Sequence, residues 1–187
     1  MRKNSLLNTM RHWQDIKMKL VFESILVGLI AGIVVVAYRI MLDYAGKFTN
    51  HAYTYMKNNY WAIPLWFLIL FGVAIFVKYR TKKVPMISGS GIPQVEGELL
   101  GHIDMSWWKT LVNKFINGAL MIGAGLSLGR EGPSVQMGAL IGKGVSRIFK
   151  RIRIEEKYLI SSGAGAGLSG AFSAPLAGIV FVLEEVH

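Results

Sequence analysis

Two long apolar runs dominate the first part of the chain. The run from Leu20 to Leu42 contains only Glu23 and Arg39 as charged residues, and the run from Trp61 to Val77 contains none. A bilayer core of about 30 Å is crossed by roughly 20 mostly apolar helical residues. Both runs are therefore long enough, and the pattern predicts spanning helices at 20–42 and 61–79.

The apolar pattern changes after Lys83, where glycine becomes frequent and the apolar runs become short. Non-helical backbone at membrane depth is tolerated only beside protein or water, and interrupted apolar segments point to a transporter's binding site. Small residues also recur at four-residue spacing, as in Gly138 and Gly142, which predicts close helix packing. We expect further helices at 92–100, 107–128, 132–149, 156–171 and 175–186, and hence an all-α integral membrane protein with a single membrane domain over 1–187.

Composition and charge support this interpretation. Hydrophobic residues make up 52% of the chain and charged residues 17%, whereas a soluble domain carries about 25% charged residues. The net charge of +10 arises from cation clusters beside the apolar runs, which is typical of cytoplasmic flanks. Residues 43–60 hold few cations and are expected outside, so the N-terminus is predicted to be cytoplasmic in a multi-pass protein of the cell (inner) membrane.

The remaining composition excludes several classes of function. No basic stripe is interleaved with aromatic residues, so we expect no nucleic acid partner. The absence of cysteine excludes disulfides, thiolate catalysis and thiolate metal sites. The four histidines lack ligand spacing, so no metal site, cofactor or enzymatic activity is predicted. Residues 1–19 alternate basic and apolar positions, which predicts a cytoplasmic interfacial helix bound to membrane lipid.

The first candidate site is the loop Gly89-Ser90-Gly91-Ile92-Pro93. Glycines on both sides of Ser90 permit a tight turn, and proline suits the first turn of a following helix. That helix would direct free N–H groups and the positive end of its dipole at the loop, which together with the serine hydroxyl makes an uncharged anion site. The loop contains no lysine or arginine, and modest binding lets an anion leave again. A simple Gly/Pro turn is the alternative.

The second candidate site is Gly129-Arg130-Glu131-Gly132-Pro133, which repeats the design with a carboxylate at the helix start. Glu131 can itself occupy the positive N-terminus, so an anion and this carboxylate would compete for one place. Protonation of Glu131 would then open the path. The alternative is a helix-capping glutamate paired with Arg130, and an ionisable group at membrane depth keeps both interpretations open.

A third feature is the acidic pair Glu184-Glu185, which follows the apolar stretch from Ile179 to Leu183. Adjacent helical positions point about 100° apart, so only one of the two side chains readily faces a given pathway. From spacing alone, a pair of juxtamembrane charges at a helix end is the favoured interpretation.

Taken together, these residues resemble the CLC family of chloride channels and proton–chloride antiporters. Residues 89–93 match the family's GSGIP motif, and residues 129–133 match its GREGP motif. Residues 171–186, which read Ala-Phe-Ser-Ala-Pro-Leu-Ala-Gly before an apolar helix ending in Glu-Glu-Val, resemble the next block. The three blocks come in the right order, and the resemblance runs over nearly the whole chain. The resemblance implies the first half of the CLC inverted-repeat fold over 20–187, with broken and re-entrant helices.

The resemblance also implies roles for individual residues. Ser90 would coordinate the central chloride, Glu131 would be the gating glutamate that passes the proton, and Glu185 would be the internal proton glutamate typical of antiporters. Ser90 fits chloride better than fluoride. The implied function is proton-coupled chloride antiport, with chloride and protons as the transported ions and no cofactor. The implied chloride-binding residues are Ser90, Gly91, Ile92, Gly129, Arg130, Glu131 and Gly132.

The resemblance ends where the first half of a CLC subunit ends. The second half would supply a GIFAP-type loop and a tyrosine that closes the central site, so Ser90 and Glu131 would form half of a coordination shell. The expected partners are that C-terminal half or a second copy of the chain, and a homodimer. A passive chloride channel and a non-transporting assembly unit stay open as alternative functions.

Overall fold

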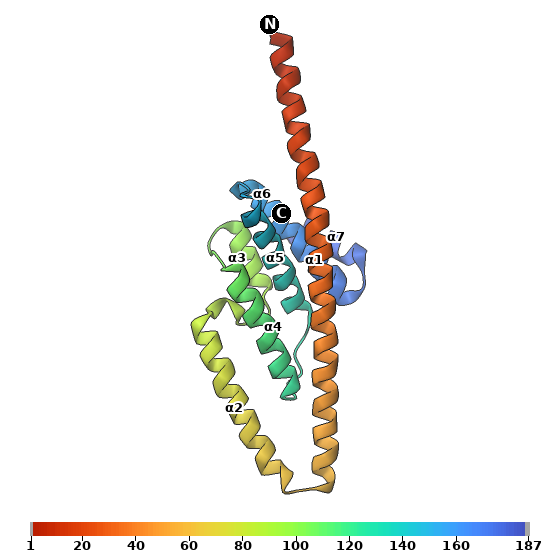
Figure 1. Ribbon diagram of the computed structural model, residues 1–187, viewed down its shortest axis with the longest axis vertical. Helices are drawn as coiled ribbons and strands as arrows, with labels where there is room; N and C mark the ends of the chain where they lie inside the picture. Colours follow the sequence, from red (N-terminus) through yellow and green to blue (C-terminus); the bar gives the residue numbers. More distant parts are fainter. Residues whose placement is uncertain (1, 186–187) are drawn as a thin grey trace.

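The computed structural model describes residues 2–185, with side chains from 17 to 184, and every element in this part is helical (Figure 1). A short 3₁₀ turn, η1, separates the second helix from the third. The elements are α1 (Arg2–Asn58), α2 (Ala62–Lys83), η1 (Pro85–Ile87), α3 (Ile92–Leu100), α4 (Trp107–Gly123), α5 (Glu131–Ile148), α6 (Arg153–Phe172) and α7 (Pro175–Glu185).

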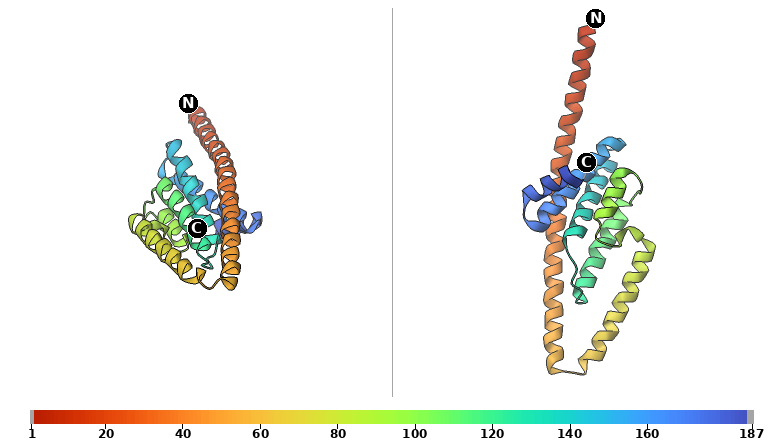
Figure 2. Two further views of the ribbon diagram at one scale, coloured as in Figure 1. Left: turned by 60° about the horizontal axis from the view of Figure 1, so that its bottom comes forward. Right: turned by 180° about the vertical axis from the view of Figure 1, so that it is seen from behind.

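Helix α1 is one continuous helix of 57 residues, about 85 Å long at 1.5 Å per residue. Its N-terminal part projects beyond the other helices, and both views in Figure 2 show the same projection. Further along, the helix presents one apolar stripe to the bundle and its other faces are largely exposed. The buried residues of this stripe are spaced three or four apart, as one helix face requires: Val27, Ala31, Val35, Tyr38 and Leu42.

This continuity differs from the prediction. An interfacial helix at 1–19, a spanning helix at 20–42 and a separate outer segment at 43–60 were expected, but α1 runs from Arg2 to Asn58 without a break. No proline occurs before Pro64 and no glycine before Gly28, so nothing in the backbone stops the helix. Charge marks where a helix changes environment, but it does not end the helix.

Helix α5 forms the centre of the bundle, and α6 lies directly against it. The two backbones touch because glycines face each other: a Cβ at Gly138 would lie 2.1 Å from the Gly163 carbonyl oxygen, and one at Gly142 would lie 2.0 Å from that of Leu159. The four-residue glycine spacing therefore does mark helix packing here. Around Gly28 and Gly32 of α1 there is open space instead.

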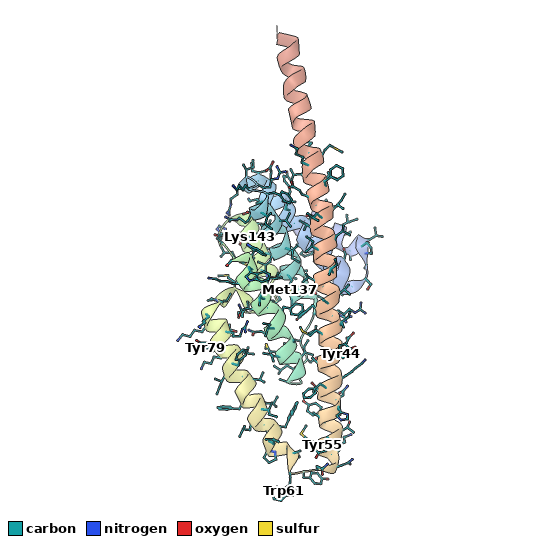
Figure 3. All side chains as sticks on the ribbon, viewed as in Figure 1. Tyr44, Tyr55, Trp61, Tyr79, Met137 and Lys143 are labelled. Carbon is teal, nitrogen blue, oxygen red and sulfur yellow. The ribbon has the colours of Figure 1, made fainter. Side chains whose placement is uncertain are left out.

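Helix α2 has no buried residue and diverges from α1 after the turn at residues 59–61 (Figures 1 and 3). Trp61 at this turn is 94% exposed, and aromatic side chains at such positions are typical of a membrane interface. The stretch Lys17–Asn58 and helix Ala62–Lys83 are the segments in the described part of the chain that are long and apolar enough to cross a membrane.

The later helices lie close to their predicted ranges, and the largest difference is at the end of α4. This helix ends at Gly123 rather than at residue 128, because Gly125 has φ +90°, in the left-handed region that terminates helices. The Thr49 hydroxyl of α1 lies 2.8 Å from the Gly123 carbonyl oxygen and caps this end. Helix α3 has its predicted bounds, whereas α6 begins three residues earlier than expected.

Candidate functional site

The first glycine loop makes a tight turn immediately before α3. Gly89 and Gly91 have φ values of +69° and +110°, which glycine adopts without strain. Ser90 is exposed between them, and Gly91 is the N-cap of α3, with Pro93 in the first turn. The first N–H groups of a helix lack intrahelical partners, so the loop combines these donors with the serine hydroxyl.

The ammonium group of Lys114 binds the backbone of this loop. Lys114 belongs to α4 and is 5% exposed. Its Nζ atom donates to the carbonyl oxygens of Ile87, at 3.0 Å, and Gly89, at 2.8 Å. The loop itself contains no cation, as the sequence shows, but the site is not free of charge, because α4 brings a buried lysine against it. The expectation of an uncharged anion site is therefore wrong.

Two glutamines bind carbonyl groups of the segment that precedes the loop. Gln94 Nε2 donates to the Ser88 carbonyl oxygen at 2.8 Å, and Gln136 Nε2 donates to that of Met86 at 2.7 Å. Together with the two bonds from Lys114, side chains from α3, α4 and α5 engage every carbonyl from residue 86 to residue 89. Carbonyl oxygens repel anions, so these bonds favour a loop that offers donors to an anion.

The second glycine loop places Glu131 at the first position of α5, with Arg130 as the N-cap. The Glu131 carboxylate folds back toward Gly129, where a Cβ would lie 2.8 Å from Oε2. It therefore lies at the positive end of its own helix. No ion pair joins Arg130 and Glu131 within the described residues, so the capping pair considered from sequence is not formed.

The two loops touch each other through their glycines. A Cβ on Gly132 would lie 2.6 Å from the Ser90 carbonyl oxygen, and one on Gly91 would lie 2.7 Å from Gln136 Cβ. Real Cβ atoms do not approach this closely, so both positions require glycine. The helix starts of α3 and α5 are thereby brought into direct contact.

A cavity of about 450 Å³ opens where the two loops meet. Ser90 and Glu131 both line it, and α1, α2 and α4 supply the remaining walls. Gly129 and Gly132 also line this cavity, whereas Gly91, Ile92 and Arg130 do not. The residues that line it are Tyr38, Val77, Thr81, Ile87, Ser88, Gly89, Ser90, Lys114, Asn117, Gly118, Met121, Leu128, Gly129, Glu131, Gly132 and Pro133.

The third predicted feature lies apart from this cavity. Glu185 is the last residue of α7, and its side chain is outside the described residues. Glu184 is exposed.

Sequence inspection missed Lys114 and Asn117. Both lie in α4, three residues apart and on one helix face. One signal was available: Lys114 and Asn117 are polar residues at a spacing of three within a helical stretch, together with Lys109, Thr110 and Asn113. No motif surrounds them, and their distance from the loops along the chain hid the contact.

A second polar cluster joins α3 and α5 away from the cavity. Lys143 Nζ lies 2.6 Å from Glu98 Oε1, and these side chains are only 3% and 1% exposed. Lys143 also pairs with Asp104 in the loop between α3 and α4. The hydrogen bond from Lys143 lowers the pKa of the Asp104 carboxyl. This pairing fixes the end of α3 against the later part of α5, and the starts of these two helices adjoin the candidate site.

Comparison with known proteins places this geometry in a family. Residues 73–187 match the family described as voltage gated chloride channel. The chain is 37% identical over 171 residues to the H(+)/Cl(-) exchange transporters ClcA of Salmonella schwarzengrund (strain CVM19633) and Salmonella agona (strain SL483). It also resembles the X-ray crystal structure of a slow cyanobacterial Cl-/H+ antiporter, with a TM-score of 0.83 and 35% identity.

The matches cover most of this chain but a smaller part of the relatives. Each ClcA match includes 90% of this chain and 36% of the relative. The antiporter structure is covered over 40% of its length and again matches 90% of this chain. The all-α membrane fold and the family expected from the three motif blocks are confirmed, and the chain belongs to the CLC family of voltage-gated chloride channels and antiporters.

Proposed function

We propose that this chain forms the anion-binding part of a chloride transporter in a cell membrane, and that the transport is coupled to protons. The cavity shared by Ser90 and Glu131 carries this proposal, because the start of α5 lies there beside the Ser90 loop, whose Gly89 carbonyl oxygen is bonded to Lys114. Unpaired backbone N–H groups, a hydroxyl and a nearby ammonium suit a small monovalent anion. The Lys114 ammonium already donates to the carbonyl oxygens of Ile87 and Gly89, which keeps anion binding weak enough for release.

Glu131 supplies the proton step of the proposed mechanism. As a carboxylate at the start of α5, it occupies the place that an anion would take. When it is protonated, its charge is lost and chloride replaces it beside Ser90. Each exchange of the two anions at this position then moves a proton with the carboxyl group and a chloride ion in the opposite sense.

Antiport rather than passive conduction is favoured by Glu185 at the end of α7. The relatives named above are exchange transporters or antiporters, and the resemblance assigns an internal proton role to this glutamate. In an antiporter, Glu185→Gln removes proton movement while chloride flux continues. In a passive channel, the same substitution leaves both measurements as they were.

Ser90 needs a partner segment in this proposal, because its side chain is exposed on the open side of the cavity. A complementary C-terminal half or a second copy of the chain would cover it and complete the coordination shell. We place the N-terminus in the cytoplasm, as the cation clusters indicate. Light scattering of the purified chain in detergent gives the number of copies, and a homodimer is the expected result.

The decisive experiment measures chloride and protons together. The purified chain is reconstituted into chloride-loaded liposomes, and chloride efflux and external pH are recorded for the unsubstituted protein, Glu131→Gln and Ser90→Ala. Coupled movement that loses its proton component in Glu131→Gln supports antiport by this chain. Efflux no faster than from empty liposomes, by protein shown to be folded, means that this chain does not transport without a complementary half.

A further inference from the structure

Asn117, a residue of helix α4, also lines the cavity, although it belongs to neither motif loop. Asn117 follows Lys114 by one helical turn, so the two side chains share a helix face. Both line the cavity that contains Ser90 and Glu131. Asn117 is only 5% exposed, so its amide lies in the interior and not at the lipid-facing surface.

The carboxamide oxygen of Asn117 is enclosed and has no hydrogen-bond partner within the described residues. The side-chain oxygens of Gln94, Thr110 and Gln136 are also buried without a partner, but those residues do not line the cavity. A buried polar group without a partner destabilises a protein. Asn117 is the residue of this group that lies at the cavity, where a bound species would give its amide a partner.

The surroundings of Asn117 indicate what that species is. Lys114 contributes a positive charge on the same face, and its donors are directed at Ile87 and Gly89. The hydroxyl of Tyr38 lies against the next residue, where a Cβ on Gly118 would be 2.1 Å from Tyr38 Oη. The wall formed by α1 and α4 therefore carries one cationic side chain and hydrogen-bond donors, in a cavity that Glu131 also lines. Once Glu131 is protonated, this wall favours an anion over a cation.

We propose that Asn117 is a specificity-determining contact for the transported anion. Its amide N–H donates to a chloride ion in the cavity. This contact rests on the proposed function, and it adds a donor from α4 to those of the two motif loops. It favours chloride over thiocyanate, whose negative charge is spread over three atoms, so that each atom accepts a weaker hydrogen bond.

Anion binding by the purified full chain in detergent tests this contact. Calorimetric titration with sodium chloride and with sodium thiocyanate, at constant ionic strength in gluconate, compares the unsubstituted chain with Asn117→Leu and Asn117→Asp. We expect Asn117→Leu to weaken chloride binding about tenfold, as for one lost hydrogen bond to an ion, with thiocyanate binding nearly unchanged. Asn117→Asp has the same shape but offers no donor, so it should weaken chloride binding further.

Thr110→Val is the matched control. Thr110 lies on the same helix and its hydroxyl is also buried without a partner, but it does not line the cavity. Chloride binding by Asn117→Leu that equals that of Thr110→Val overturns this proposal, while weaker binding by Ser90→Ala would still support the proposed function. If the unsubstituted chain binds no chloride, both proposals fail. If circular dichroism shows that Asn117→Leu is misfolded, the shape-preserving Asn117→Asp decides.

Discussion

The Nζ atom of Lys114 lies 2.8 Å from the carbonyl oxygen of Gly89, so a buried cation of α4 is bound to the backbone of the Ser90 loop. A second bond from the same nitrogen reaches the Ile87 carbonyl oxygen. The same ammonium group therefore holds the loop through two hydrogen bonds and adds positive charge to the cavity. Structure and electrostatics at this site cannot be changed independently.

Replacing this lysine should lower both stability and anion affinity. Lys114→Met leaves two loop carbonyl oxygens without donors, and we expect a loss of about 3 kcal/mol in the free energy of unfolding. Chloride binding should weaken as well, because the cavity loses its ammonium group. Thermal unfolding in detergent, followed by circular dichroism, measures the first effect. The exposed Lys109 on the same helix is the control, and Lys109→Met should change neither quantity; equal behaviour of the two variants would contradict this role.

The contact between the two loops should tolerate no side chain at Gly132. In Gly132→Ala, the new Cβ would collide with the Ser90 carbonyl oxygen, so the loops must separate at a cost of about 1–3 kcal/mol. We expect chloride binding to weaken in parallel. Gly72→Ala is the comparison, because a Cβ there has open space, and it should be neutral or slightly stabilising in this helix. Titration with chloride and thermal unfolding distinguish the two, and unaltered chloride affinity in Gly132→Ala would refute the shared site.

The buried pair between α3 and α5 should depend on both of its members. Lys143→Met leaves the Glu98 carboxylate buried without a cation, and we expect a loss of about 3–5 kcal/mol in the free energy of unfolding. The double variant Glu98→Gln with Lys143→Met removes both charges, so it should recover part of this loss. Denaturant unfolding of the single and double variants gives the coupling. If the double variant is no more stable than Lys143→Met, the carboxylate is not the cause.

Low pH should weaken the ion pair between Asp104 and Lys143, because it protonates the Asp104 carboxylate. Its hydrogen bond with Lys143 lowers the pKa of the carboxyl in the folded protein, relative to about 3.9 in an unfolded chain. This contribution to stability is therefore fully present above the unfolded pKa, and it is lost as the pH falls through the folded pKa. The carboxylate is 71% exposed, so the effect should be small. Asp104→Asn should show a flatter loss of thermal stability below about pH 4 than the unsubstituted chain, and identical acid profiles would exclude the contribution.

Much of the fold could be predicted from the sequence, because apolar runs and glycine spacing report local structure. The start of α3 followed from Pro93, and the four-residue spacing of Gly138 and Gly142 indicated close helix packing without identifying α6 as the partner. The continuity of α1 could not be predicted, since charge and hydropathy describe the environment of a helix and do not mark where its backbone ends.

The candidate site could be predicted only in part for a similar reason. Ser90 and Glu131 belong to loops whose glycines and prolines are adjacent in sequence. Lys114 and Asn117 act across the fold, and only the packing of α4 against the loops brings them to the cavity. Their roles depend on tertiary contacts that no local pattern encodes.

The glycine contact between α5 and α6 also bears on how fast the proposed gate at Glu131 can work. At Gly138 and Gly142 the backbones of the two helices lie directly against each other. The helix that carries Glu131 is therefore held as a rigid support, so the moving part of the proposed gate is the carboxyl side chain. Rotation of a side chain takes picoseconds to nanoseconds, whereas collective helix motion takes microseconds or longer. The slow step of turnover should then be the arrival of a proton or an anion, and not the movement of the gate.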